Sequence, residues 1–139
     1  MTANKKNYSL ANAGNLSDLA GKEIDGMKGR FMPGKALGLT GCEVSINSTP
    51  AGGFAPFVHS HKMNEEVYII ASGKGVFHVD GDEFPVQEGS VIRVAPGGKR
   101  AIKAADEPLV YFCIQAREGS LVQASMEDGI INDEKASWM

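Results

Sequence analysis

The sequence has little cysteine, no long hydrophobic run and no excess of positive charge, and each absence excludes a class of protein. Its two cysteines are too few for a disulfide framework. No apolar stretch approaches the roughly 20 residues that a membrane-spanning helix needs. Lysine and arginine number 14 against 17 acidic residues, and the net charge of −3 argues against nucleic acid as the main partner. Residues 1–15 are polar and show no secretory signal, so we expect a cytoplasmic protein.

Short strands separated by glycine and proline turns are what the sequence does contain. The 42% of hydrophobic residues suffice for a buried core, and the 17 glycines indicate many turns. Residues 42–47 alternate apolar and polar side chains, which is typical of a half-buried strand. Asp80-Gly81 predicts a tight hairpin with positive φ at both residues, and Pro85 predicts an edge strand. Strands are expected at residues 42–47, 67–70, 76–79, 83–86, 90–94, 101–104 and 109–115.

This spacing of strands predicts an all-β protein built as an antiparallel β-sandwich or barrel. The barrel domain is expected over residues 28–120, with an extended chain at 28–48. Residues 1–27 form an N-terminal extension that is irregular or holds a short helix capped by Ser17. Residues 121–139 form an irregular, acidic tail that we expect to pack on the barrel rim, or alternatively to cover its mouth as a lid.

The segment His59-Ser60-His61, followed by Glu65-Glu66, contains the candidate metal-binding or catalytic residues. Residues i and i+2 of a strand point to the same face, so the two histidines can converge on one point. A following carboxylate can return to that point if the chain bends. Two imidazoles and one carboxylate suit Zn, Fe, Mn, Ni or Cu, and three protein ligands leave positions open as catalytic metals require.

The spacing around these residues resembles the first conserved motif of the cupin superfamily. Its elements are Gly53, His59-Ser60-His61, Glu66 and Gly73, followed by Gly75, Asp80-Gly81, Gly89 and Ala95-Pro96-Gly97. The resemblance covers roughly residues 40–115. It implies a small antiparallel barrel or jelly roll with the site inside its mouth, and a homodimer. It also implies one divalent metal ion, held by His59, His61 and Glu66, because Glu66 directly precedes a Val-Tyr pair; Glu65 is the alternative ligand.

Arg100 is a departure from the cupin pattern, whose second motif usually supplies a third histidine at this position. Arginine has no lone pair and cannot ligate a metal. In one interpretation, Arg100 turns away from the metal and binds a substrate carboxylate or phosphate in bidentate fashion. In the other, no metal binds, Arg100 pairs with Glu65 or Glu66, and the histidines carry protons.

Other side chains are candidates of lower rank. Tyr68 has the same strand parity as Glu66, so it either lines the cavity as a hydrogen-bond donor or packs in the core. His78 is expected to face solvent or a dimer partner, or else to replace the missing ligand. Arg93 is expected at the surface or beside an acid, and Cys113 as an inert buried residue.

Together these features predict a metal-binding cupin that acts on a small anionic or oxygen-rich metabolite inside the barrel. The reaction would be of the oxygenase, decarboxylase, isomerase or lyase type, with Arg100 and Tyr68 as candidate catalytic residues. Two alternatives dispense with the metal. One is an isomerase or epimerase of the sugar type, and the other is a non-catalytic module that binds a small ligand through Arg100.

Overall fold

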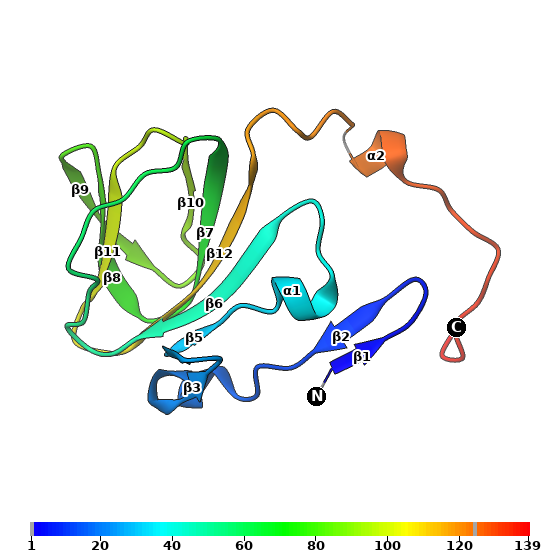
Figure 1. The fold of residues 1–139 in the computed structure, drawn as a ribbon, viewed down its shortest axis with the longest axis horizontal. Helices are drawn as coiled ribbons and strands as arrows, with labels where there is room; N and C mark the ends of the chain where they lie inside the picture. The colour runs from blue at the N-terminus through cyan, green and yellow to red at the C-terminus, as the bar shows by residue number, and fades with distance from the viewer. Residues whose placement is uncertain (1, 124) are drawn as a thin grey trace.

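The computed structural model describes residues 2–123 and 125–139, and most of its strands form two antiparallel sheets (Figure 1). The larger sheet has the order β10-β7-β12-β6-β5, and the smaller one has the order β11-β8-β9. The larger sheet contains β5 (Arg30–Phe31), β6 (Glu43–Thr49), β7 (Asn64–Ser72), β10 (Val91–Val94) and β12 (Leu109–Arg117). The smaller sheet contains β8 (Lys74–Val79), β9 (Asp82–Gln87) and β11 (Arg100–Ala104).

These strands confirm the all-β jelly roll that the sequence predicts, and each expected strand from residue 42 onward is present. Asp80 and Gly81 have φ values of 51° and 92°, as the predicted hairpin turn requires. Pro85 lies in β9, which is an edge strand of the smaller sheet. Strand β7 begins at Asn64, earlier than expected, so Glu66 belongs to a regular strand.

The N-terminal region differs in part from the prediction. It holds β1 (Thr2–Asn4), β2 (Ser9–Ala11), the 3-10 helix η1 (Leu16–Gly21), β3 (Glu23–Ile24) and β4 (Met27–Lys28). A short helix is present as expected, but Ser17 does not cap it. The helix follows Asn15, whose side chain makes no capping hydrogen bond. The expected extended run at 28–48 is interrupted by α1 (Gly34–Leu37), which ends at Gly38 in the left-handed conformation.

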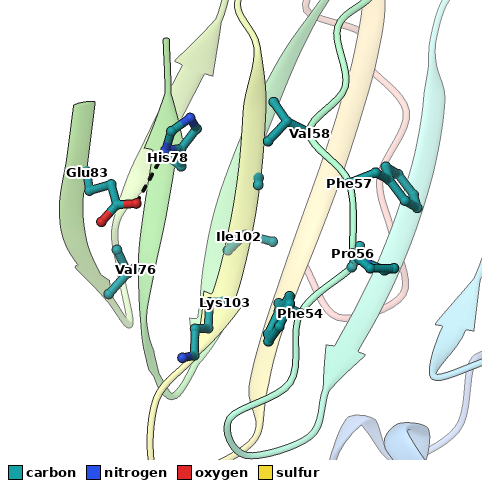
Figure 2. A pocket seen from close by; sticks show the side chains of 11 residues that line it. Phe54, Pro56, Phe57, Val58, Val76, His78, Glu83, Ile102 and Lys103 are labelled. Atoms are coloured by element: carbon teal, nitrogen blue, oxygen red, sulfur yellow. Dashed lines mark ion pairs between the residues drawn. The ribbon is translucent and has the colours of Figure 1, made fainter. Parts of the chain in front are cut away.

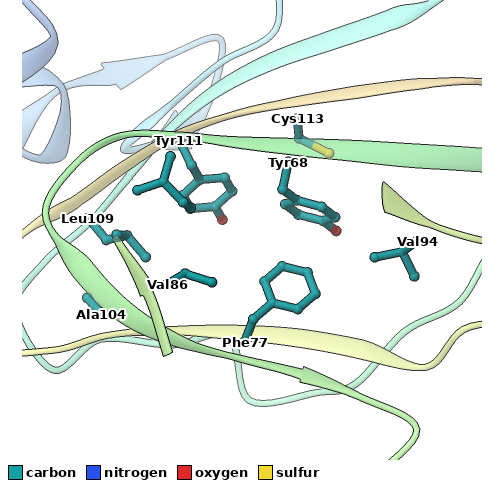
Figure 3. Packing of buried hydrophobic residues seen from close by; sticks show 9 residues of the cluster. Tyr68, Phe77, Val86, Val94, Ala104, Leu109, Tyr111 and Cys113 are labelled. Atoms are coloured by element: carbon teal, nitrogen blue, oxygen red, sulfur yellow. The ribbon is translucent and has the colours of Figure 1, made fainter. Parts of the chain in front are cut away.

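The hydrophobic core lies between the two sheets (Figure 3). Alternate residues of β7 point inward, and Tyr68 and Ile70 are 5% and 1% exposed. From β8, Phe77 is fully buried and meets the Tyr68 ring edge-on, with ring centroids 4.9 Å apart. Burying a phenylalanine side chain contributes roughly 1.5–3 kcal/mol, so Phe77 is a principal contact between the sheets.

The segment between β6 and β7 crosses from the larger sheet to the smaller one and pairs with β11. Gly53 accepts a backbone hydrogen bond from Ala104, and Phe54 forms a bridge with Lys103. His59 exchanges two backbone hydrogen bonds with Arg100, of 3.1 and 2.9 Å. This pairing holds the segment His59-Ser60-His61 against Arg100, the first residue of β11.

The C-terminal segment contains one short helix, α2 (Ser125–Asp128), and runs clear of the barrel (Figure 1). Its large hydrophobic side chains are exposed, including Leu121 at 85%, Ile131 at 101% and Trp138 at 83%. In this structure they are away from the barrel rim on which the sequence analysis expects the tail to pack. Among the described residues, no helix has the length and apolar character to span a membrane.

The close approach of β8 to β11 leads to a test of the packing. A Cβ atom on Gly75 would press against the carbonyl oxygen of Lys103 and lie 3.0 Å from a methyl of Leu109, whereas one on Gly97 would meet nothing within 4 Å. Gly75→Ala is expected to lower the free energy of unfolding by about 1–3 kcal/mol, because the backbone must shift. Gly97→Ala is expected to change it by less than about 0.5 kcal/mol. Urea unfolding measures both, and equal effects would contradict the packing described.

Candidate functional site

A cavity of about 370 Å³ opens inside the barrel, between the inner face of the larger sheet and β11. It is lined by two histidines of the crossing segment and by side chains of β5, β6, β7, β11 and β12. The site residues expected from the sequence meet here, because the cavity wall includes His59, His61, Glu66, Tyr68 and Arg100.

His59, His61 and Glu66 form a cluster that could hold a metal ion. The Nε2 atoms of His59 and His61 lie 3.5 and 3.0 Å from Oε1 of Glu66. Ligand atoms bound about 2.1 Å from one metal ion, at angles of about 90–110°, lie roughly 3.0–3.4 Å apart. The observed separations and the donor types therefore fit a divalent transition metal.

Backbone contacts bring the three ligand candidates together. His59 pairs with Arg100, and the backbone N–H of His61 donates to the carbonyl of Pro96 at 2.8 Å. Both histidines thus lie in the crossing segment outside the long strands, whereas Glu66 lies on β7 and points inward with Tyr68. The bend between His61 and Glu66 returns the carboxylate to the histidines, as the sequence interpretation requires.

Glu66 is 3% exposed, and protein donors surround its carboxylate. The hydroxyl of Tyr68 donates to Oε1 at 3.0 Å, and the thiol of Cys113 donates to Oε2 at 2.7 Å. Burial raises the pKa of Glu66, but these two hydrogen bonds and the charges of His61 and Arg100 outweigh it and lower the pKa below its ordinary value. Glu66 is therefore an anion at neutral pH.

The protonation of the neighbouring groups also favours ligation. Burial lowers the pKa of His59; Glu66 opposes this shift, while the charges of Arg100 and His61 add to it. A neutral imidazole keeps the lone pair that a metal needs. Burial also raises the pKa of both Tyr68 and Cys113, so these groups remain hydrogen-bond donors to Glu66.

Arg100 is the largest of the fully buried side chains, with 1% of its surface exposed. Its Nη2 donates to the carbonyl of Ala95 at 3.0 Å, and its Nη1 lies 3.6 Å from Oε1 of Glu66. Its Nε and Nη1 have no hydrogen-bond partner among the described residues. Unsatisfied donors on a buried cation are costly, so this guanidinium has capacity for an anion in the cavity.

The remaining candidates lie elsewhere. Glu65 is on the other face of β7, because neighbouring strand residues alternate, and it pairs with the exposed Arg93 at 2.7 Å. It is not part of the ligand cluster. His78 lies 3.4 Å from Glu83 on the outer face of the smaller sheet, beside a shallow groove of about 810 Å³ (Figure 2). That position agrees with the expected outward orientation and separates His78 from the cluster.

The sequence reasoning missed one wall of the cavity. In β6, the polar residues Ser45 and Asn47 are buried and line the cavity, whereas Val44 and Ile46 are only partly buried. Arg30, from the adjacent strand β5, reaches the same cavity. Period-two alternation in residues 42–47 signals that two faces differ, but it does not say which face is inside.

Known proteins resemble this chain in sequence and in fold. The cupin domain family matches residues 47–115. A cupin protein from Bacteroides fragilis has a solved structure that is 48% identical, with a TM-score of 0.73, covering 80% of this chain and 95% of that one. A protein of uncharacterised function from Methanocaldococcus jannaschii is 31% identical over 62 residues, 44% of this chain. The match spans 50% of that relative, so this chain covers about half of its length.

Two further solved structures share the fold at lower identity. A predicted oxalate decarboxylase from Thermotoga maritima is 24% identical, covers 60% of this chain and 73% of that one, and has a TM-score of 0.54. A sugar phosphate isomerase from Silicibacter pomeroyi is 22% identical, covers 64% of this chain and 60% of that one, and has a TM-score of 0.58. The chain has a jelly-roll fold and the histidine motif, and a solved relative matches 80% of the chain. The chain therefore belongs to the cupin superfamily.

Proposed function

We propose that this cupin binds one divalent metal ion through His59, His61 and Glu66, and a small carboxylate- or phosphate-bearing metabolite through Arg100. The observation that carries the proposal is the buried guanidinium of Arg100, whose Nε and Nη1 lack partners among the described residues beside the ligand cluster. A bidentate carboxylate or phosphate satisfies such donors. The ligand would then lie between the anchor and the metal.

The charges in the cavity favour this assignment. Glu66 is the carboxylate of the described cluster, and the combined charge of a divalent metal and Arg100 exceeds its charge. A net positive, largely buried site attracts an anion. The same electrostatics oppose metal binding in the absence of an anion, because the guanidinium and the metal repel each other. Metal and anion are therefore expected to bind cooperatively.

Each side chain has a role in this arrangement. A bound metal would polarise an oxygen of the ligand or supply an open coordination position. Arg100 orients the acid group, and Tyr68 and Cys113 hold the two oxygens of Glu66. Phe57 borders the cavity, with its ring centroid 6.3 Å from that of His59. We propose an enzyme of the decarboxylase, isomerase, lyase or oxygenase type.

A metal-free function is the second candidate, and the 3.6 Å separation between Arg100 and Glu66 favours it. In that case the ion pair with Arg100 keeps Glu66 charged without a metal. His59 and His61 would then move protons to or from an anionic ligand such as a sugar phosphate. Insensitivity of ligand binding or turnover to a chelator distinguishes this candidate from the first.

The adjacent acids Glu65 and Glu66 provide a matched test of metal binding. Glu66→Gln is expected to weaken the binding of Zn²⁺, Mn²⁺ or Fe²⁺ at least roughly 100-fold, because a buried ligand loses its charge. Glu65→Gln should retain wild-type affinity, since Glu65 lies on the opposite face with Arg93. Elemental analysis of the untagged protein and calorimetric titration measure both. Equal metal content in the two variants would refute the assigned ligand set.

Arg100 variants test the anion anchor. Arg100→Gln is expected to lower the affinity of the metal-loaded protein for acetate, glycolate and inorganic phosphate about tenfold or more, because the bidentate contact is lost. Arg100→His should lose anion affinity and bind metal more tightly, since it exchanges a repelling cation for a ligand. Arg93→Gln, at the exposed surface, is the control. Unchanged anion affinity in Arg100→Gln would exclude Arg100 as the anchor.

A further inference from the structure

The inner face of β6 presents polar side chains to the cavity at a place where a core strand ordinarily presents apolar ones. Asn47 and Ser45 are 4% and 8% exposed, and both line the cavity wall. Burying two polar side chains costs free energy unless they are hydrogen-bonded. The hydrogen-bond partners of Asn47 and Ser45 therefore indicate which group this wall positions.

The wall positions Arg30. The Nε–H of Arg30 donates to Oδ1 of Asn47 at 2.7 Å, and Nδ2 of Asn47 donates to Oγ of Ser45 at 2.9 Å. Because Nε is held by a buried amide, the orientation of the guanidinium is restrained. Its two terminal nitrogens have no hydrogen-bond partner among the residues that the structure describes. Arg30 thus offers a pre-oriented pair of donors at the cavity.

Arg30 and the ligand cluster lie on separate parts of one cavity. In the sheet order β7-β12-β6-β5, the strand of Arg30 is three steps from that of Glu66. Three inter-strand steps of about 4.8 Å correspond to roughly 14 Å between the strands. The cavity volume of about 370 Å³ corresponds to roughly a dozen water molecules at about 30 Å³ each. This space accommodates an elongated small molecule.

The cavity is lined by two guanidiniums, which suit a ligand with two acid groups. These are Arg30 and Arg100, and the carboxylates that line the cavity are Glu43 and Glu66. Arg100 faces Glu66, whereas Arg30 is held by neutral groups and keeps its full charge available. Arg30 also borders a polar cavity of about 300 Å³ and is exposed, so it remains hydrated until a ligand binds.

We propose that Arg30, positioned by Asn47 and Ser45, forms a second anion subsite, and that the ligand is an elongated small molecule with an acid group at each end. One acid group binds at Arg100 and the cluster, and the other binds at Arg30. This inference rests on the proposed function, because it takes Arg100 as the first anchor. Arg30 is a specificity-determining residue that selects two-ended acids over molecules with one acid group.

The experiment compares dicarboxylates, from butanedioate to octanedioate, with monocarboxylates of the same chain length, by calorimetric titration of the metal-loaded full-length protein. The best dicarboxylate is expected to bind about tenfold more tightly than its matched monocarboxylate, because a second charge-assisted contact forms. In Arg30→Gln this ratio should fall below about twofold, because dicarboxylates lose a second contact that monocarboxylates do not make. Arg30→Lys should retain part of the ratio, since the charge remains and the bidentate geometry is lost.

Lys28→Gln is the matched control, because Lys28 lies two residues earlier and does not line the cavity. It should retain the wild-type ratio, and the melting temperature of each variant verifies its folding. A ratio that is close to one in the wild type, or that survives in Arg30→Gln, overturns the second subsite alone. Absence of any monocarboxylate binding that depends on Arg100 overturns the proposed function instead.

Discussion

The carboxylate of Glu66 is the charge around which the interior of this barrel is arranged. It is nearly inaccessible to solvent, hydrogen bonds reach it from the crossing segment and the larger sheet, and the charge of Arg100 lies near it from the smaller sheet. A buried carboxylate is tolerated only when hydrogen bonds and opposite charges replace its lost hydration. Tyr68 and Cys113 donate such hydrogen bonds to Glu66, from positions that in a simple core would hold apolar side chains. Core packing and site chemistry therefore share the same residues of β7 and β12.

Arg100 gives the site its individual character. A histidine there would complete a conventional set of neutral ligands, whereas a guanidinium adds charge and two unsatisfied donors. A barrel interior that buries such a group without full hydrogen bonding gains little stability from it. The burial of Arg100 is therefore not explained by a contribution to folding stability. The outer groove of Figure 2, although larger, contains no comparable convergence of buried donors.

Much of the fold followed from local patterns in the sequence. The Asp80-Gly81 turn, the edge position of Pro85 and the strand series depend on backbone preferences that short segments carry themselves. The meeting of His59, His61 and Glu66 also followed from spacing. The expected capping role of Ser17 was wrong: the helix follows Asn15, because tertiary contacts decide where a short helix begins. The polar wall of β6 was missed because alternation identifies two faces without saying that the inner one surrounds a polar cavity.

The backbone pairing of His59 with Arg100 connects the histidine–carboxylate cluster to the buried guanidinium. His59 and Arg100 sit on directly paired backbone positions, so the main chain sets the spacing of their backbones. Strands β5 and β6 form another part of the cavity wall, at the end of the larger sheet, and none of the three described cluster residues lies on them. Substitutions in β5 and β6 would therefore reshape one part of the cavity and leave the spacing of His59 and Arg100 unchanged.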